Sequence, residues 1–256
     1  MADVELEIDH RVATVTINRP AARNAIGLAT IVELGAVLDE IADGAADVLV
    51  LRGGGDRAFI SGGDLKELAA IRDEAGAAAM AISMRRLLDR IACFPVPVIA
   101  GLNGHALGGG AEVAVAADIR LAADDVQIGF SQVTLGIMPA WGGAERLVEI
   151  VGRSKAMLLV GLGRRLGAAD AERLGLIDLV VPRADFDASL RELAESLGNL
   201  PPTAAAAIKA VIAAARPHVH RDQEAGAVAH FARLWASEEH WLAVDRMSIR
   251  AAAKAP

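Results

Sequence analysis

The amino-acid sequence predicts an α/β fold, and three observations support that prediction. Short apolar segments typical of β-strands are interleaved with longer segments whose apolar residues recur at helical spacing. The composition is that of a globular protein, with 54% hydrophobic and 23% charged residues. At 256 residues the chain is long enough to bury a sizeable core, so we expect one domain or one domain with an appendage.

The N-terminal elements follow from their apolar patterns. Residues 3–9 and 12–18 alternate polar and apolar side chains, which predicts a β-hairpin. Residues 28–43 repeat apolar side chains at helical spacing and stop before Gly44, which is a common helix end. Residues 47–52 are almost wholly apolar and predict a short buried strand.

The middle of the chain continues this alternation. Residues 58–64 predict a glycine-bearing loop, and helical patterning begins at Leu65. A glycine-rich turn precedes a helix predicted at about 109–116. Buried strands are predicted at 95–100, 118–122 and 126–129.

The C-terminal part is mostly helical in pattern. Helical spacing dominates after about residue 145, and residues 201–256 are rich in alanine with few turn signals. We therefore divide the chain into a core at 1–200 and a helical region at 201–256, which packs on that core or on a neighbouring subunit.

Composition excludes several classes of partner and compartment. A net charge of −7 argues against nucleic-acid binding, which needs a basic stripe, so a phosphate-bearing partner must be held by a few local groups. The single cysteine, Cys93, indicates a reducing cytoplasm. The acidic first residues do not resemble an export signal. The uncharged run 91–111 is interrupted by prolines and glycines, so we expect no membrane span there.

Two glycine-rich turns, at 61–63 and 108–110, each follow a buried segment and open a helix. Backbone N–H groups at a helix start lack partners, and glycine lets them approach a ligand closely, so a converging pair could form an oxyanion hole. Tight helix–strand packing is the alternative explanation for either turn. Neither turn fits a P-loop, no serine-hydrolase elbow is present, and no His/Cys spacing predicts a metal site.

Several long motifs resemble the crotonase family of enoyl-CoA hydratases and isomerases. The strongest are AFISGGDLK at 58–66, PVIAGLNGHALGGGAE at 97–112, and LGIMP at 135–139 followed by Gly142 and Gly143. Shorter similarities occur at the sites NRP (18–20), NA (24–25), VGRSKA (151–156) and AADAERLGLI (168–177). The matches run in order from about residue 12 to 182.

The resemblance implies a spiral of repeated ββα units with a C-terminal helical trimerisation region. It implies an acyl-CoA thioester as substrate, no separate cofactor because coenzyme A is part of the substrate, and a homotrimer or dimer of trimers. By position, Gly63 and Gly109 would supply the two oxyanion amides, and Asp64, Leu65 and Lys66 would line the pantetheine of CoA.

Glu112 is the candidate acid/base. A carboxyl group in an apolar cavity tends to a raised pKa, which suits proton exchange near neutral pH. The alternatives are a carboxylate stabilised by the helix dipole or one half of a buried ion pair. The resemblance and the neighbouring glycines favour catalysis.

The main departure from the family is at Gln132. Hydratases of the family use a second glutamate there, and an amide cannot act as a general acid at neutral pH. Gln132 is therefore expected to orient water or substrate. The chain fits a hydratase-like lyase, with an acyl-CoA decarboxylase, an isomerase or a non-catalytic acyl-CoA-binding protein as alternatives.

Other residues are weaker candidates. Ser61 could contact substrate, although a hydroxyl beside two glycines is more often a turn former. Trp141 either shapes the acyl pocket or packs in the core. His105 is expected in the wall of the site, and Asp118 is expected to pair structurally at a strand start. The basic residues considered for CoA contact are Arg23, Arg250 and Lys254.

Overall fold

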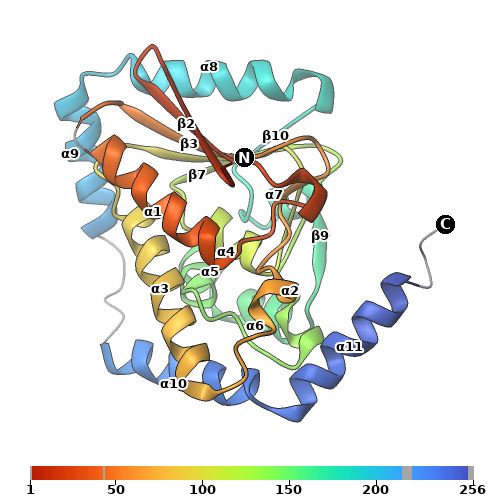
Figure 1. The fold of residues 1–256 in the computed structure, drawn as a ribbon. Helices are drawn as coiled ribbons and strands as arrows, with labels where there is room; N and C mark the ends of the chain where they lie inside the picture. The colour runs from red at the N-terminus through yellow and green to blue at the C-terminus, as the bar shows by residue number, and fades with distance from the viewer. Residues whose placement is uncertain (1, 43, 215–220, 253–256) are drawn as a thin grey trace.

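The computed structural model describes residues 2–42, 44–214 and 221–252 (Figure 1). Across these residues the chain forms two β-sheets covered by helices, so the predicted α/β class is confirmed. Figure 1 shows α8 above the larger sheet, α1 and α3 below it, and α11 pointing away from the body of the molecule.

The larger sheet has six strands in the order β1-β2-β3-β5-β7-β10. Only β1 and β2 pair antiparallel, and every later neighbour pairs parallel. The central strands are buried on both faces, as apolar parallel strands under helices should be. The strands are β1 (Val4–Asp9), β2 (Val12–Ile17), β3 (Val48–Gly53), β5 (Val98–Leu102), β7 (Ile119–Ala123) and β10 (Leu179–Val181).

The smaller sheet has four strands in the order β4-β6-β8-β9. β4, β6 and β8 run parallel to one another, and β9 is antiparallel to β8. Its members are β4 (Ala58–Ile60), β6 (His105–Leu107), β8 (Gln127–Gly129) and β9 (Arg165–Gly167). This sheet determines where the glycine-rich turns lie.

Helices connect and cover both sheets. The α-helices are α1 (Leu28–Ala42), α2 (Leu65–Leu68), α3 (Glu74–Ala92), α4 (Gly109–Ala114), α5 (Gly143–Val151), α6 (Arg153–Gly161), α7 (Ala168–Arg173), α8 (Phe186–Gly198), α9 (Pro202–Ala214), α10 (Arg221–Trp235) and α11 (Glu238–Ala252). Three short 3-10 helices are η1 (Pro20–Ala22), η2 (Gln132–Leu135) and η3 (Arg183–Asp185) within the part that the structure describes.

The predicted hairpin, the first helix and the strand after it are confirmed. The hairpin turn places His10 and Arg11 in the left-handed region, with φ of 45° and 64°. The Arg11 guanidinium pairs with Asp47, which keeps the pKa of that carboxyl below its usual value, and the Asp47 N–H donates to the Arg11 carbonyl at 2.7 Å. The residue directly before β3 therefore braces the turn.

Several short strands differ from the prediction. The segment predicted as a loop at 58–64 begins with β4, and the strand predicted at 95–100 begins only at Val98. Pro95 and Pro97 lack the N–H that a central strand must donate, which explains the later start. The strands β6, β9 and β10 have three residues each and were not predicted, because so short a segment has no readable period.

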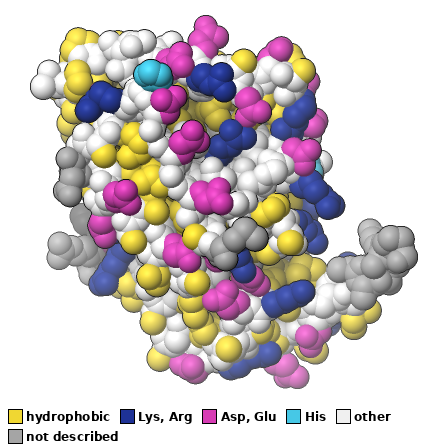
Figure 2. Space-filling view, turned by 45° about the horizontal axis from the view of Figure 1, so that its top comes forward, with side chains coloured by type: hydrophobic (Ala, Val, Ile, Leu, Met, Phe, Trp, Pro, Cys, Tyr) yellow, Lys and Arg dark blue, Asp and Glu magenta, His cyan; other side chains and the backbone are white. Residues whose placement is uncertain are grey.

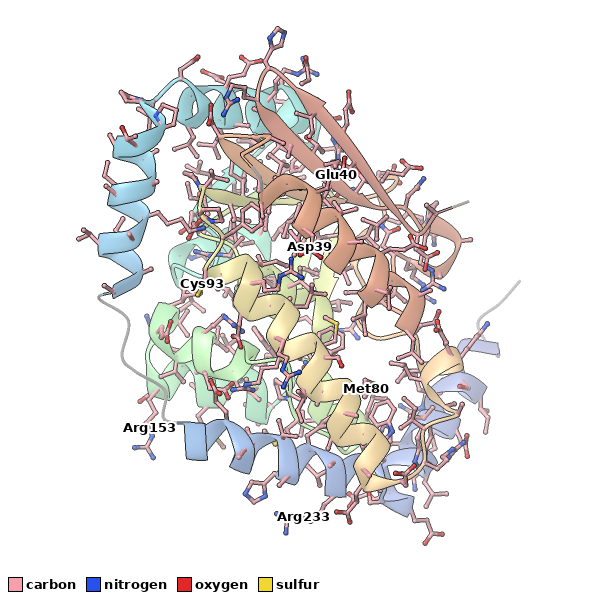
Figure 3. The ribbon with its side chains drawn as sticks, turned by 60° about the vertical axis from the view of Figure 1, so that its left-hand side comes forward. Asp39, Glu40, Met80, Cys93, Arg153 and Arg233 are labelled. Atoms are coloured by element: carbon pink, nitrogen blue, oxygen red, sulfur yellow. The ribbon has the colours of Figure 1, made fainter. Side chains whose placement is uncertain are left out.

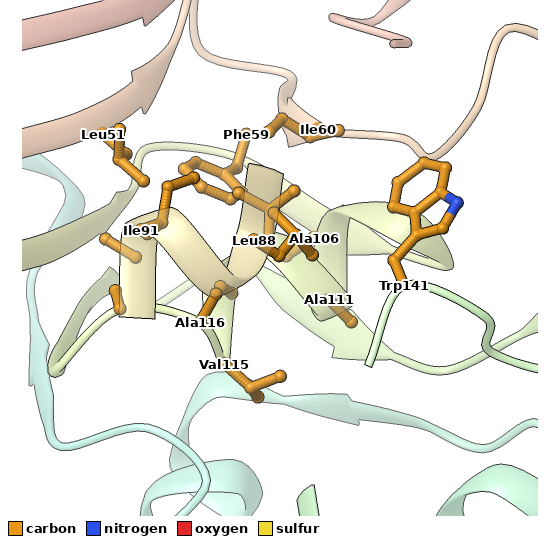
Figure 4. Close-up of a cluster of buried hydrophobic side chains, with 14 of the residues drawn as sticks. Leu51, Phe59, Ile60, Leu88, Ile91, Ala106, Ala111, Val115, Ala116 and Trp141 are labelled. Atoms are coloured by element: carbon orange, nitrogen blue, oxygen red, sulfur yellow. The ribbon is translucent and has the colours of Figure 1, made fainter. Parts of the chain in front are cut away.

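The core lies between the sheets and α3. Phe59 of β4 is fully buried beside Leu88 and Ile91 of α3, as the cluster in Figure 4 shows. At the surface an ion pair between Asp39 of α1 and Arg90 of α3 joins the two helices, and Figure 3 shows Asp39 beside α3.

The C-terminal helices contact the core. α10 packs against α3, and Trp235 Nε1 donates to the Ile71 carbonyl at 2.9 Å. Lys209 of α9 donates to the Val96 carbonyl at 2.8 Å, and α11 contacts η2. These contacts agree with packing on the core, while the division at residue 200 stays a prediction.

Within the described ranges no single helix is long and apolar enough to cross a membrane. The segments 183–198 and 202–214 reach that length and apolar composition only when taken together, and they are bent by 101° at the break between them.

Candidate active site

Two glycine-rich turns meet at one edge of the smaller sheet. β4 and β6 are parallel neighbours, so the turns that follow them, Gly62–Gly63 and Gly108–Gly109, emerge at the same edge. A methyl group built on Gly62 would lie 3.4 Å from the Gly109 nitrogen. The two turns therefore lie side by side in the structure.

The turn after β4 is held by a backbone bridge to Ile26. The Ile26 N–H donates to the Gly62 carbonyl at 2.8 Å, and the Asp64 N–H donates to the Ile26 carbonyl at 2.8 Å. The amide of Gly63 lies between these bonds, and among the described residues neither it nor the Gly109 amide donates to another group. An amide without a partner is suited to an acceptor that a ligand supplies.

A different physical constraint requires glycine at each position of the triplet after β6. Gly108 has φ of 56° and ψ of −120°, a conformation that only glycine adopts readily. A Cβ on Gly109 would meet the Trp141 ring, with Cε3 at 2.9 Å and two ring carbons closer. A Cβ on Gly110 would lie 2.6 Å from the carbonyl carbon of Ile60 and closer to its oxygen.

Glu112 lies in the first turn of α4 and is only 2% exposed. Its Oε1 accepts hydrogen bonds from the N–H of Trp141 at 2.8 Å and of Gly143 at 3.0 Å. Its Oε2 accepts from Gln132 Nε2 at 2.9 Å. No cation pairs with this carboxylate in the part of the chain that the structure describes, so the ion-pair alternative is not supported.

Burial raises the pKa of Glu112 to about 7. Desolvation is the largest cause, because the charged form loses its water, and the nearby charge of Glu145 acts in the same direction. The hydrogen bonds from Gly143, Trp141 and Gln132 oppose the shift. A carboxyl group that titrates near neutral pH can both take and return a proton.

The raised pKa makes a testable prediction about stability. Folding favours the neutral acid. The contribution of Glu112 to the free energy of unfolding is therefore complete below about pH 4.5 and is lost as pH rises through about 7. The lost contribution is about 3 kcal/mol. We expect the free energy of unfolding of Glu112→Gln, relative to the parent, to rise by about this amount between about pH 4 and about pH 8. Urea titrations at each pH measure it, and a difference that stays constant with pH would contradict the prediction.

Gln132 opens η2 and is 7% exposed. Its amide nitrogen donates to Glu112, whereas its Oε1 is buried and has no hydrogen-bond partner among the described residues. A buried acceptor without a partner is costly, so this oxygen is suited to a donor supplied by water or substrate.

The loop between η2 and α5 is held by two buried arginines. Arg85 of α3 donates to the Ala140 carbonyl at 3.3 Å and pairs with Glu145. Arg146 of α5 donates to the Trp141 carbonyl at 3.2 Å and pairs with Asp89. The Arg85 contact holds the peptide unit between Ala140 and Trp141, whose N–H reaches Glu112, and the Arg146 contact holds the next peptide unit. Sequence reasoning missed Arg85 and Arg146, because only tertiary packing brings α3 to this loop.

Gly143 is a further residue whose role the sequence did not reveal. Its N–H binds Glu112, and a Cβ there would lie 2.7 Å from the Glu112 Cβ. The pair Gly142–Gly143 belonged to a recognised motif, which was the available signal.

The residues predicted to line the pantetheine lie beside Gly63. Asp64 caps α2 by accepting from the N–H groups of Lys66 and Glu67, and its carboxylate pairs with Arg19 at 2.9 Å. Leu65 packs partly buried against the core, and Lys66 is exposed. Substrate contact by these residues stays a prediction. The Asp64 carboxylate is already bound by the α2 amides and by Arg19.

Ser61, Asp118 and His105 all form hydrogen bonds within the protein. The Ser61 N–H donates to the Arg23 carbonyl at 3.2 Å, which ties the turn to the loop before α1. Asp118 accepts from the Val98 N–H at 2.8 Å and pairs with Lys209 at 2.7 Å, so its predicted structural role is confirmed. His105 is exposed and accepts from the Gln127 N–H at 3.1 Å.

Basic side chains gather in a hollow at the other end of β4. The hollow has a volume of about 280 Å³ and is lined by Arg23, Asp56, Arg57, Gly104, His105, Asp125 and Arg183. Arg183 pairs with Asp125. Of the two tail residues considered, Arg250 is exposed on α11 and Lys254 lies outside the described residues.

Two further surface features do not belong to the candidate site. A hollow of about 460 Å³ lies between η2 and α11, and neither Glu112 nor the two glycines line it. Figure 2 shows acidic and basic side chains interspersed over one face. No group of three metal-ligating side chains occurs in the part of the sequence that the structure covers.

Comparison with known proteins adds to this geometry. The family model described as enoyl-CoA hydratase/isomerase matches residues 7–244. A probable enoyl-CoA hydratase of Mycobacterium bovis is 35% identical over 207 residues, which cover 81% of this chain and 79% of that protein. The short-chain-enoyl-CoA hydratase of Clostridium acetobutylicum is 36% identical over 203 residues, covering 79% and 77%.

Solved structures agree with these relatives. An enoyl-CoA hydratase from Mycobacterium avium subsp. paratuberculosis superposes with a TM-score of 0.86 at 27% identity, covering 95% of this chain and 98% of that chain. An enoyl-CoA hydratase from Bacillus anthracis superposes with a TM-score of 0.81 at 31% identity, covering 98% of this chain and 96% of that chain.

Proposed function

The chain belongs to the enoyl-CoA hydratase/isomerase family, and from this premise we propose that it is a hydratase-like enzyme acting on an acyl-CoA thioester through an enolate. The crotonase fold expected from the resemblance is confirmed by the same matches, and the C-terminal helices are present.

The carbonyl oxygen of the thioester is proposed to bind between the amides of Gly63 and Gly109. Adjacent strands lie about 5 Å apart, so two N–H groups from neighbouring strand ends can both reach one oxygen at about 2.9 Å. An oxyanion hole of this kind stabilises the charge that develops on the oxygen when the enolate forms. The support is the paired position of the two amides and their lack of described partners.

Glu112 is proposed to perform both proton transfers. As the carboxylate it takes a proton from water while the water oxygen adds to the β-carbon and the electron pair moves to the thioester oxygen. As the resulting acid it returns that proton to the α-carbon, and the thioester carbonyl re-forms. A pKa of about 7 serves both steps, because the two forms of the carboxyl group are then close in free energy near neutral pH.

Gln132 is proposed to orient the water. Its Nε2 holds Glu112, and its partnerless Oε1 can accept one hydrogen of a water whose other hydrogen points to the carboxylate. This single observation carries the assignment of Gln132 as a positioning residue.

A decarboxylase is the second candidate, and the amide at Gln132 is what favours it. Loss of carbon dioxide produces the enolate without a base, so one acid and the oxyanion hole suffice. A non-catalytic acyl-CoA-binding protein is the third candidate, because it would need neither acid. The retained Glu112, with its pKa near neutrality, weighs against that third candidate.

Restoring a second carboxyl group tests whether the remaining machinery works. We expect Gln132→Glu to raise the rate of crotonyl-CoA hydration roughly a hundredfold or more, because a second general acid–base group is worth about that factor. Stopped-flow or steady-state absorbance of the enoyl thioester measures the rate. The new carboxyl would face Glu112 at hydrogen-bond distance, so the pair should titrate in two separated steps. A rate that does not change would mean that the pocket, and not the acid, limits hydration.

The phosphates of CoA are proposed to lie in the basic hollow at the start of β4. Arg57 is six residues before Gly63, and an extended chain of that length spans roughly 20 Å. Arg23 and Arg57 form no ion pair within the described ranges, so their charges are available. The overall charge is negative, so local cations are needed to hold a polyanion.

Assembly as a homotrimer or dimer of trimers is likewise proposed. Exposed apolar side chains on α6 and α11 support it, because apolar surface gains free energy when a second copy covers it. They include Met157, Leu158, Leu242 and Ile249.

The direct test of the proposed function is mass spectrometry of crotonyl-CoA incubated with the protein in heavy water. Addition of one water with deuterium at the α-carbon would support the hydratase. Crotonyl-CoA that remains unchanged would contradict the short-chain hydratase and leave the decarboxylase and the binding protein to be tested.

A further inference from the structure

The side chain of Trp141 lies across both glycines of the proposed oxyanion hole. Its six-membered ring is the nearest neighbour of Gly109, and the carbons Cζ2 and Cη2 of the same ring lie 3.8 and 3.9 Å from a methyl group built on Gly63. The residue is 7% exposed. Figure 4 shows the indole beyond Ile60 and Ala111, with its nitrogen directed away from the buried cluster.

The backbone of Trp141 is held on three sides. Its N–H donates to Glu112, its carbonyl accepts from Arg146, and the carbonyl of the preceding residue accepts from Arg85. Gly142 follows with φ of 87° against the Arg146 guanidinium. The backbone that carries the indole is therefore fixed, because a shift of the loop would break the hydrogen bond to Glu112.

The acyl group of a bound thioester must share this space. Its carbonyl oxygen has to approach both glycine amides to about 3 Å, and its α-carbon has to face Glu112. The carboxylate of Glu112 sits on the backbone N–H of Trp141, 2.8 Å away. The first carbons of the acyl chain therefore lie beside the indole, and the carbons of a longer chain collide with it.

We propose that Trp141 is a specificity-determining residue whose indole ring limits the substrate to short acyl groups. The proposal rests on the proposed function, since it requires the thioester to bind at Gly63 and Gly109. Leu68 also lies against Gly63, with Cδ1 3.0 Å from a methyl group built there, so a second apolar side chain narrows the space beside this glycine.

Binding of saturated acyl-CoAs tests the proposal without turnover. Isothermal titration calorimetry with butyryl-, hexanoyl- and decanoyl-CoA measures how affinity depends on chain length, and free CoA gives the baseline. We expect the parent protein to bind decanoyl-CoA roughly tenfold or more weakly than butyryl-CoA, because a methylene that does not fit is worth about that factor. In Trp141→Ala the order should reverse, with decanoyl-CoA bound more tightly.

Trp141→Phe provides a second variant that keeps a ring on the glycines. It should give an intermediate dependence on chain length, and it keeps the test informative if the alanine variant does not fold. Equal affinity of the parent for all chain lengths would overturn the proposal and leave the proposed function standing. The same would follow if both variants depended on chain length as the parent does. Absence of binding by CoA and by every acyl-CoA would overturn the proposed function and this proposal with it.

Discussion

Replacing Glu112 with glutamine is expected to lower kcat roughly a hundred- to ten-thousandfold. The substitution keeps the size of the side chain and removes the buried carboxyl group to which both proton transfers are assigned. The amide can still accept from Trp141 and Gly143, and Gln132 can turn its free oxygen towards the new NH₂ group. We therefore expect the fold to persist and KM to change little, as steady-state kinetics and circular dichroism would measure.

A matched control is Glu40→Gln, the same chemical change on the exposed surface of α1 (Figure 3). It should leave kcat and KM as they are in the parent. If Glu112→Gln also retained the parent kcat in a folded protein, Glu112 would not be the acid/base and the proposed mechanism would fail.

Replacing Gly110 with alanine is expected to lower the free energy of unfolding by about 3 kcal/mol or more. The added methyl would meet the Ile60 backbone, whose carbonyl carbon would lie 2.6 Å away. Backbone cannot rotate aside as a side chain can, so β4 and α4 would have to separate. The midpoint of thermal unfolding should fall by roughly 6–12 °C, which calorimetry measures.

Gly226→Ala is the control for this substitution. Gly226 also lies within a helix, and a methyl built there meets nothing within 4 Å. Alanine should stabilise α10 by about 0.5–1 kcal/mol, because it is the better helix former. A Gly110→Ala protein as stable as the parent would show that the approach of α4 to β4 is looser than the structure indicates.

The glycine triplet illustrates how far the sequence could be interpreted. Its position after an apolar strand predicted a turn, a helix start and an unpaired amide, and the described residues contain all three. It could not tell that the three glycines have different roles, because those depend on a backbone angle at Gly108, a ring at Gly109 and a carbonyl at Gly110. Two of these neighbours come from segments far away in the sequence.

Glu112 and Gln132 were both recognisable as candidates from their motifs. The hydrogen bond between them, and the two backbone amides that hold the other carboxylate oxygen, arise only when η2 and the loop before α5 fold over α4. Arg85 could not be related to this loop at all, since 55 positions separate it from the Ala140 carbonyl that it binds.

By itself the sequence determined the α/β class, the order of the longer elements and the pair of turns that carry the proposed oxyanion amides. Hydrophobic periodicity and glycine placement are local properties of the chain, so they can be read without coordinates. Only the tertiary structure decided the three-residue strands β6 and β9, the groups that set the pKa of Glu112 and the placement of the Trp141 ring over Gly109. Each of these depends on which distant groups exclude water from, or pack against, a given atom, and that information is present only in the folded chain.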